Sequence, residues 1–169
     1  SVHVPLTPEA ILESSVLMLS AHNILSPAHG RPLMTPSQDI VAGVYYMTKP
    51  KPSLGEAKQC FDDFATVHSV YALGELKIHS PIRFYYEGKS YDTTVGRVLL
   101  NEVLPEQLRF VNKLVAKGEL VALIDGCARS LGLDATAKLL DDVKALCFEM
   151  ATRSGLSIGM EDVVVPKEK

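Results

Sequence analysis

The chain contains five histidines and two adjacent aspartate pairs, residue types that bind metals or transfer protons in catalysis. No two histidines have the HxH or HxxxH spacing of a metal site, and no acidic residue stands at ligand spacing to two of them. Asp62–Asp63 and Asp141–Asp142 are expected on the solvated sides of helices, not in an acid–base pair. We therefore predict no catalytic residue and no metal ligand here. The histidines, expected at the surface or at caps, are His3, His22, His29, His68 and His79.

The sequence also lacks a nucleophilic or nucleotide-binding motif. It has no GxSxG, no P-loop and no GxGxxG. Cys60, Cys127 and Cys147 are odd in number and far apart, without a CxxC pair. We expect reduced, buried thiols that act as small hydrophobic residues.

Composition limits the possible function classes. The chain has 169 residues, a length typical of one domain or two small lobes, and 47% of them are hydrophobic. Its 17 basic and 20 acidic residues give a net charge of −3, whereas autonomous nucleic-acid binders usually carry a basic excess. No apolar run approaches the ~20 residues that span a bilayer, and no signal peptide opens the sequence. These features predict a soluble, cytoplasmic protein without membrane contact.

One segment has a composition suited to a special loop. Residues 153–159 read Arg-Ser-Gly-Leu-Ser-Ile-Gly, so Gly155 and Gly159 can adopt positive φ, and both serines can bind turn amides. An ordinary turn at the end of a helix would have the same composition. The segment alone identifies no ligand.

Residue patterns in the first half predict helices. Thr7-Pro8-Glu9 has the order of a helix start, and Ser37 is expected to cap a helix over 38–47. Prolines at 50 and 52 predict a linker over 49–53. A helical stretch is expected to follow, bearing Ala57, Phe61, Phe64, Ala65 and Val67 or His68, and to end before Gly74.

In the second half, a hairpin precedes three helices. Residues 82–87 alternate apolar and polar, and the turn at Glu87-Gly88-Lys89 leads into Ser90–Val95. Pro105 is expected to open a helix with Leu108, Val111 and Val115 facing inward. Helices over 119–131 and from Asp134 should follow, separated by Gly132, with a stripe on the last formed by Ala137, Leu140, Val143, Cys147 and Met150. The fold class is therefore α+β, mainly helical with a small β-hairpin region and a helical hairpin.

Five collinear blocks make the chain resemble the β′ subunits of bacterial RNA polymerase. The first is Ser-Val-His-Val-Pro-Leu-Thr at the start, and the second contains Asn-Ile-Leu-Ser-Pro-Ala followed by Pro-Ser-Gln-Asp. Val-Tyr-Tyr-Met-Thr, Thr-Thr-Val-Gly-Arg and Leu-Gly-Leu-Asp-Ala-Thr follow in order, and the final loop completes the match. The blocks occupy 1–7, 18–39, 44–48, 93–105 and 131–141. Residues 49–91 match less closely.

The resemblance implies a role for each region. Residues 1–48 would follow the double-psi barrel, 49–103 would form a linker, helix and hairpin of the funnel, 104–151 the rim helices of the secondary channel, and 152–169 an F-loop-like segment. That loop would support the active centre through Arg153, Ser154, Gly155, Leu156, Ser157, Ile158 and Gly159. Channel regulators such as Gre-type factors would dock at Asn112, Lys113 and Lys117, which are expected on the exposed side of the helix after Pro105.

The resemblance also implies what the chain needs from elsewhere. The aspartates that bind catalytic magnesium would precede Ser1, so the chain would hold no cofactor and would be inactive alone. Its partners would be the β, α, ω and σ subunits and the rest of β′, with DNA, RNA and nucleotides reached only through the whole enzyme. The alternative is a stand-alone module that recruits a transcription regulator without catalysis. Co-purification with the other subunits would distinguish the two.

Overall fold

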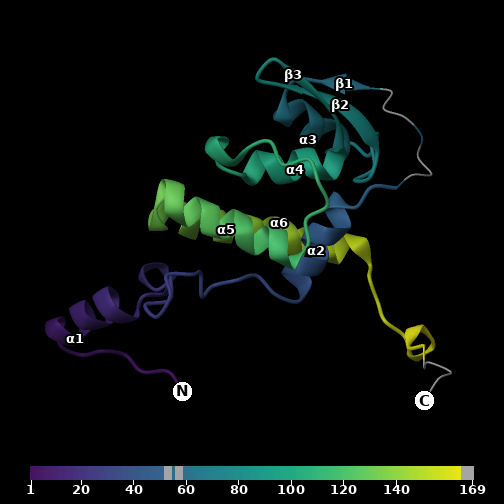
Figure 1. Ribbon diagram of the computed structural model, residues 1–169. Coiled ribbons are helices and arrows are strands. Elements are labelled where there is room, and N and C mark those ends of the chain that lie inside the picture. The colour runs from purple at the N-terminus through teal and green to yellow at the C-terminus, as the bar shows by residue number, and fades with distance from the viewer. Residues whose placement is uncertain (52–54, 56–58, 165–169) are drawn as a thin grey trace.

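The computed structural model describes residues 1–51, 55 and 59–164. These residues form six α-helices and a three-stranded sheet, which confirms the predicted α+β class. The sheet packs with α3 and α4, while α2, α5 and α6 form a second group beneath them (Figure 1). The elements are α1 (Pro8–Glu13), α2 (Asp39–Thr48), β1 (Cys60–Phe61), α3 (Phe64–Ala72), β2 (Pro81–Tyr86), β3 (Lys89–Thr94), α4 (Val95–Val103), α5 (Lys117–Leu131) and α6 (Leu133–Ser154).

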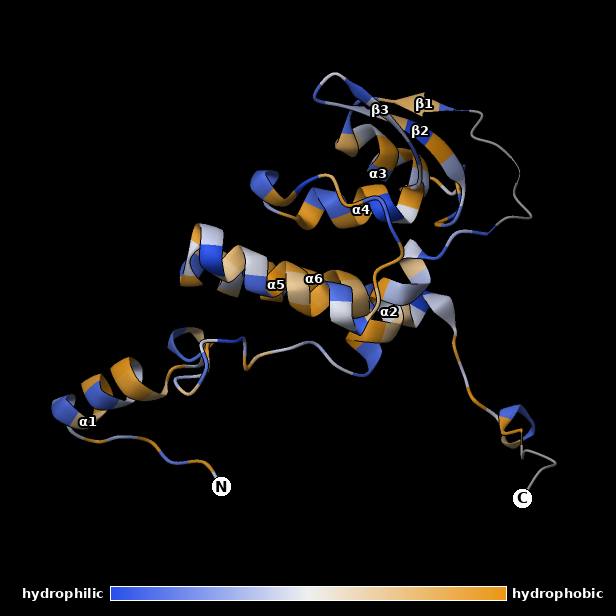
Figure 2. Ribbon diagram, viewed as in Figure 1, coloured by the Kyte–Doolittle hydropathy of each residue, from blue (hydrophilic) through white to orange (hydrophobic). Residues whose placement is uncertain are grey.

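The N-terminal arm begins as predicted. The Thr7 hydroxyl accepts a hydrogen bond from the Ala10 amide at 3.2 Å, and Pro8 occupies the first turn. A π-helical turn, Ser14–Met18, continues α1. The arm projects away from the other helices (Figure 1), and its apolar positions, orange in Figure 2, include the exposed side chains of Leu12 and Leu17.

The predicted second helix is present as α2, but its cap differs. Ser37 was expected to cap it through its hydroxyl, and that prediction is wrong. Gln38 is the cap residue, with a φ of 47° and no side-chain cap bond. The Ile40 amide instead donates to the carbonyl oxygen of Ser37 at 3.2 Å. The backbone turn at Gln38 therefore makes a hydroxyl cap unnecessary.

The helix expected from Ala57 onward starts later. Ala57 lies outside the described residues, and Phe61 belongs to β1, which pairs in parallel with β2 through Phe61 and Phe84. Asp63 ends this extended stretch because its carboxylate accepts the Thr66 amide at 2.9 Å and so caps α3.

The hairpin is confirmed. β2 pairs antiparallel with β3, and the two turn residues Glu87 and Gly88 have φ values of 48° and 76°. Positive φ at both positions matches the twist of the two strands. Ile82 and Phe84 point to the buried face, where the Phe84 ring lies 4.8 Å from that of Phe64 in α3. The period of two in the sequence therefore predicted the correct face.

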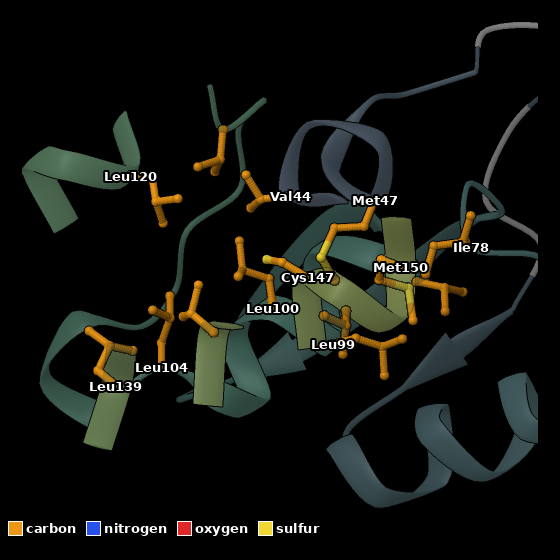
Figure 3. Packing of buried hydrophobic residues seen from close by; sticks show 14 of the residues in the cluster. Val44, Met47, Ile78, Leu99, Leu100, Leu104, Leu120, Leu139, Cys147 and Met150 are labelled. Atoms are coloured by element: carbon orange, nitrogen blue, oxygen red, sulfur yellow. The ribbon is translucent and has the colours of Figure 1, made fainter. Parts of the chain in front are cut away.

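The core forms where α2 crosses α6. Val44 and Met47 of α2 contact a cluster that includes Cys147 and Met150 of α6 (Figure 3). A Cβ at Gly43 would overlap the carbonyl oxygen of Cys147. Because that oxygen belongs to a helix backbone, only glycine permits this close crossing.

The prediction of a helix after Pro105 is wrong. Only a 3-10 turn, Glu106–Leu108, follows the proline, and the chain is then extended until α5 begins at Lys117. The Asn101 side chain binds both backbone groups of Val111, at 2.7 Å to its amide and 2.8 Å to its carbonyl. These bonds replace the helical ones and hold the segment against α4.

α5 and α6 form the expected helical hairpin. Gly132 separates them with a φ of 87°. Val143, Cys147 and Met150 are buried as predicted, whereas Thr136 and Leu139 take the places expected for Ala137 and Leu140. Among the residues that the structure describes, no helix combines the length and apolar content needed to cross a membrane.

Candidate functional site: the loop after α6 and the segment before α5

The candidate loop leaves a firmly packed helix end. Cys147 and Met150 of α6 are buried. Burial raises the pKa of the Cys147 thiol to about 12, so it stays protonated and serves as a core side chain. The last turns of α6 are therefore fixed in position where the loop begins.

Gly155 ends the helix in the left-handed conformation that the glycine-containing composition of residues 153–159 predicted. Its φ is 60° and its ψ 24°, and its amide donates to the Thr152 carbonyl at 3.3 Å. Arg153 and Ser154, expected in the loop, are the last two residues of α6. The Ser154 hydroxyl donates to the Ala151 carbonyl at 2.6 Å, a bond that extends the helix to this point.

Residues 156–159 form the exposed part of the loop, which runs away from the helices (Figure 1). Leu156 and Ile158 are 67% and 85% exposed, although both are apolar. Gly159 has a φ of −90°, so it does not need glycine's left-handed freedom, and its amide donates to the Asp162 carboxylate at 2.8 Å. Among the described residues, a Cβ at Gly155 would meet nothing within 4 Å.

Arg153, expected among the residues of the supporting loop, binds the carboxylate of Glu149, one turn earlier in α6, at 2.7 Å. Its second contact is with Tyr71 of α3, whose hydroxyl lies 3.2 Å from the guanidinium and whose ring centroid lies 5.4 Å away. The hydrogen bond to Tyr71, followed by the charge of Glu149, raises the pKa of Arg153. The sequence analysis did not identify Tyr71.

The residues proposed for regulator docking occupy a different element from the one expected. Asn112 and Lys113 lie in the extended segment, and Lys117 is the first residue of α5. Asn112 is half-buried: its amide donates to the Asp92 carbonyl at 2.9 Å, and its oxygen accepts from Arg97 at 3.0 Å. Lys113 and Lys117 are exposed. Asn112 is therefore committed to internal contacts, while both lysines are accessible.

A polar junction behind this segment was also missed from the sequence. Arg97 donates to the Thr48 carbonyl at 3.0 Å as well as to Asn112, and partial burial lowers the pKa of its guanidinium. The Thr48 hydroxyl accepts the Val115 amide at 3.0 Å and donates to the Val44 carbonyl at 2.7 Å. The end of α2, the start of α4 and the entrance to α5 are thus joined by side-chain bonds.

The aspartates, histidines and cysteines take mostly structural places. Asp63 is a cap and not the solvated helix face that was expected, and its bonds to Thr66 lower its carboxyl pKa. Asp141 and Asp142 are exposed on α6, as predicted. Cys60 is exposed, so its predicted burial is wrong: it lies at the edge of the sheet in β1.

His79 is the histidine that departs most from a surface role. It is buried, and its Nδ1 lies 3.0 Å from the Lys49 carbonyl. Burial lowers its pKa, which favours the neutral ring. Within the described ranges, no cluster of three or more His, Cys, Asp or Glu residues is arranged to hold a metal ion.

Comparison with known proteins identifies the family. The family described as RNA polymerase Rpb1, domain 3, matches residues 23–163. The β′ subunits of DNA-directed RNA polymerase from Syntrophobacter fumaroxidans, Desulforudis audaxviator and Aquifex pyrophilus are 46%, 43% and 46% identical to the whole chain. The chain spans 13%, 15% and 11% of their respective lengths. The chain belongs to the family of the bacterial RNA polymerase β′ subunit, in the region of Rpb1 domain 3.

Proposed function

We propose that the chain works in the cytoplasm as part of the β′ subunit of DNA-directed RNA polymerase, where it shapes the secondary channel and supports the active centre. The observation that carries this proposal is the loop after α6. Leu156, Ile158 and Met160 are 67%, 85% and 94% exposed next to a buried helix end. Apolar side chains presented in this way favour contact with other protein elements.

Support of the active centre would be mechanical. Nucleotidyl transfer requires metal-bound carboxylates, and we propose that these lie in the rest of the enzyme together with the bridge helix and trigger loop. The magnesium held there would stabilise the charge that develops on the transferred phosphate. The residues of this chain would limit the positions open to the catalytic elements, because α6 is fixed and Gly155 sets the direction in which the loop leaves it.

Gly155→Val in the complete polymerase tests this role. A β-branched residue at a φ of 60° costs about 1–3 kcal/mol. A Cβ there has no neighbour within 4 Å among the described residues, so steric overlap with them adds nothing. We expect a slower single-nucleotide addition rate with little change in the melting temperature. Gly155→Asn is the matched control, since asparagine tolerates the left-handed conformation, and it should add nucleotides at nearly the normal rate.

A drop in melting temperature with a normal addition rate would leave Gly155 as a simple helix stop and would refute the supporting role. The proposal also implies that the purified chain alone incorporates no nucleotide on a primed template. Incorporation by a preparation free of polymerase would contradict it.

We propose further that Lys113 and Lys117 belong to a docking surface for Gre-type channel regulators. Both are exposed, Lys113 in the segment before α5 and Lys117 at its first residue, so they are accessible to an acidic partner. Reversing both to Glu should weaken the regulator mainly by slowing its salt-dependent association. Lys138→Glu, an exposed charge reversal on α6, is the control. Unchanged affinity at low salt in the double variant would contradict the docking role.

A further inference from the structure

Tyr71 lies where the sheet-bearing part of the chain meets the end of α6. It is half-buried in the last turn of α3, and its hydroxyl lies 4.0 Å from the Met150 sulfur and 3.2 Å from the Arg153 guanidinium. The guanidinium also lies over the Tyr71 ring, 5.4 Å from its centroid. One tyrosine thus contacts α6 both within the core and at its exposed final turn.

The other bonds that side chains in the final turn of α6 donate stay within the helix. Arg153 also binds Glu149, but that residue belongs to the same helix and moves with it. Ser154 donates to Ala151, again within α6. Among the hydrogen bonds and ion pairs described for residues 153–159, the bond to Tyr71 is the one that reaches an element preceding α6, whereas the Gly159 amide binds Asp162 just after the loop. Packing on α2 fixes the body of α6, where Gly43 lies against the Cys147 carbonyl, and the bond to Tyr71 is the hydrogen bond that ties the final turn to α3.

We propose that Tyr71 is a positioning residue for the loop of 156–159, acting through Arg153. The inference rests on the proposed function, because the loop must support the active centre for its position to affect catalysis. The hydroxyl fixes the Arg153 guanidinium, and the guanidinium holds the last turn of α6 in the register from which Gly155 departs. Without the hydroxyl, the turn keeps its helical bonds but loses its fixed relation to α3.

The test is Tyr71→Phe in the complete polymerase, because phenylalanine retains the ring, which packs against the core, and removes the hydroxyl that binds Arg153. At saturating nucleotide, we expect the addition rate to fall by about two- to fivefold, the range of one exposed charge-assisted contact. The melting temperature and the KM for nucleotide should stay nearly unchanged. Tyr85→Phe is the matched control, because that tyrosine is exposed on β2, and it should keep the normal rate.

A double-variant cycle separates positioning from a general structural effect. If Tyr71 acts through Arg153, Tyr71→Phe should slow an Arg153→Met enzyme no further. Independent effects that multiply, or a normal rate in Tyr71→Phe, would overturn the inference. Gly155→Val shows whether a negative result concerns Tyr71 alone or the proposed function of the loop. If Gly155→Val slows nucleotide addition and Tyr71→Phe does not, only the role of Tyr71 is refuted. If both enzymes run normally, the supporting role of the loop is refuted as well.

Discussion

Replacing Asn101 by alanine should destabilise the chain more than any other single amide deletion that the structure suggests. Asn101 is fully buried in α4. Its amide donates at 2.8 Å to the carbonyls of both Arg97 and Val111, and its oxygen accepts the Val111 amide at 2.7 Å. The substitution would leave both backbone groups of Val111 without these partners.

The magnitude follows from the number of groups left unpaired. A buried donor or acceptor without a partner costs about 1–3 kcal/mol. Two such groups at Val111, with some relief from entering water, give an expected loss of about 3–5 kcal/mol in the free energy of unfolding. The extended segment before α5 should also become accessible to proteases, because these bonds hold it on α4.

Urea unfolding followed by circular dichroism measures the loss. The matched control is Asn23→Ala, since the Asn23 amide also donates twice, to Leu17 and Leu19 at 3.0 Å each, but at an exposed site. Water can replace those bonds, so we expect a change below about 1 kcal/mol. Equal losses in the two variants would refute the argument that burial, and not bond count, decides the cost.

Two further predictions concern packing and pH. Gly43→Ala should lower the free energy of unfolding by about 3 kcal/mol or more, because its Cβ would overlap the Cys147 carbonyl. The control Gly126→Ala, on the open side of α5, should raise that free energy by about 0.5–1 kcal/mol. Equal urea midpoints in the two variants would contradict the close crossing of α2 and α6. Burial lowers the pKa of His79 from its ordinary 6.5, so its contribution to stability is present above pH 6.5 and is lost as the pH falls below that value. Unfolding measured from pH 7.5 to 5 should show a smaller decline in His79→Gln than in the exposed-site control His68→Gln, and parallel declines would exclude the role of His79.

Local signals in the sequence predicted the elements that depend on local chemistry. The alternation over β2 and the Glu87-Gly88 turn gave the hairpin, and the Thr7-Pro8 start gave α1. Both Gly155 and Gly159 were expected to permit positive φ, and Gly155, which directly follows α6, is the one that adopts it. In each case the decisive interactions join residues a few positions apart, so the pattern contains the information needed.

The failures arise where distant residues decide. Pro105 resembles a helix start, but the Asn101 side chain binds the backbone of Val111. In addition, the Thr48 hydroxyl, 67 positions from Val115 in the sequence, accepts a hydrogen bond from the Val115 amide. Phe61 resembles a helix position, but pairing with Phe84 makes it a strand. The contact of Tyr71 with Arg153 joins residues 82 positions apart, so no local sequence pattern could predict it.

The blocks that resemble the β′ family meet one another in the structure. Met47 and Thr48, from the Val-Tyr-Tyr-Met-Thr block, contact Gly96 and Arg97, from the Thr-Thr-Val-Gly-Arg block. A Cβ at Gly96 would overlap the Met47 carbonyl, and Arg97 binds the carbonyl of Thr48 next to it. Both sequences are restricted by the same close approach of the α2 and α4 backbones. This approach leaves no room for a side chain at position 96. At position 97, the guanidinium binds the carbonyl that is left without a helical partner at the end of α2. These motifs therefore specify how the scaffold is joined, and the groups proposed to act on the polymerase active centre lie beyond it, at the end of α6.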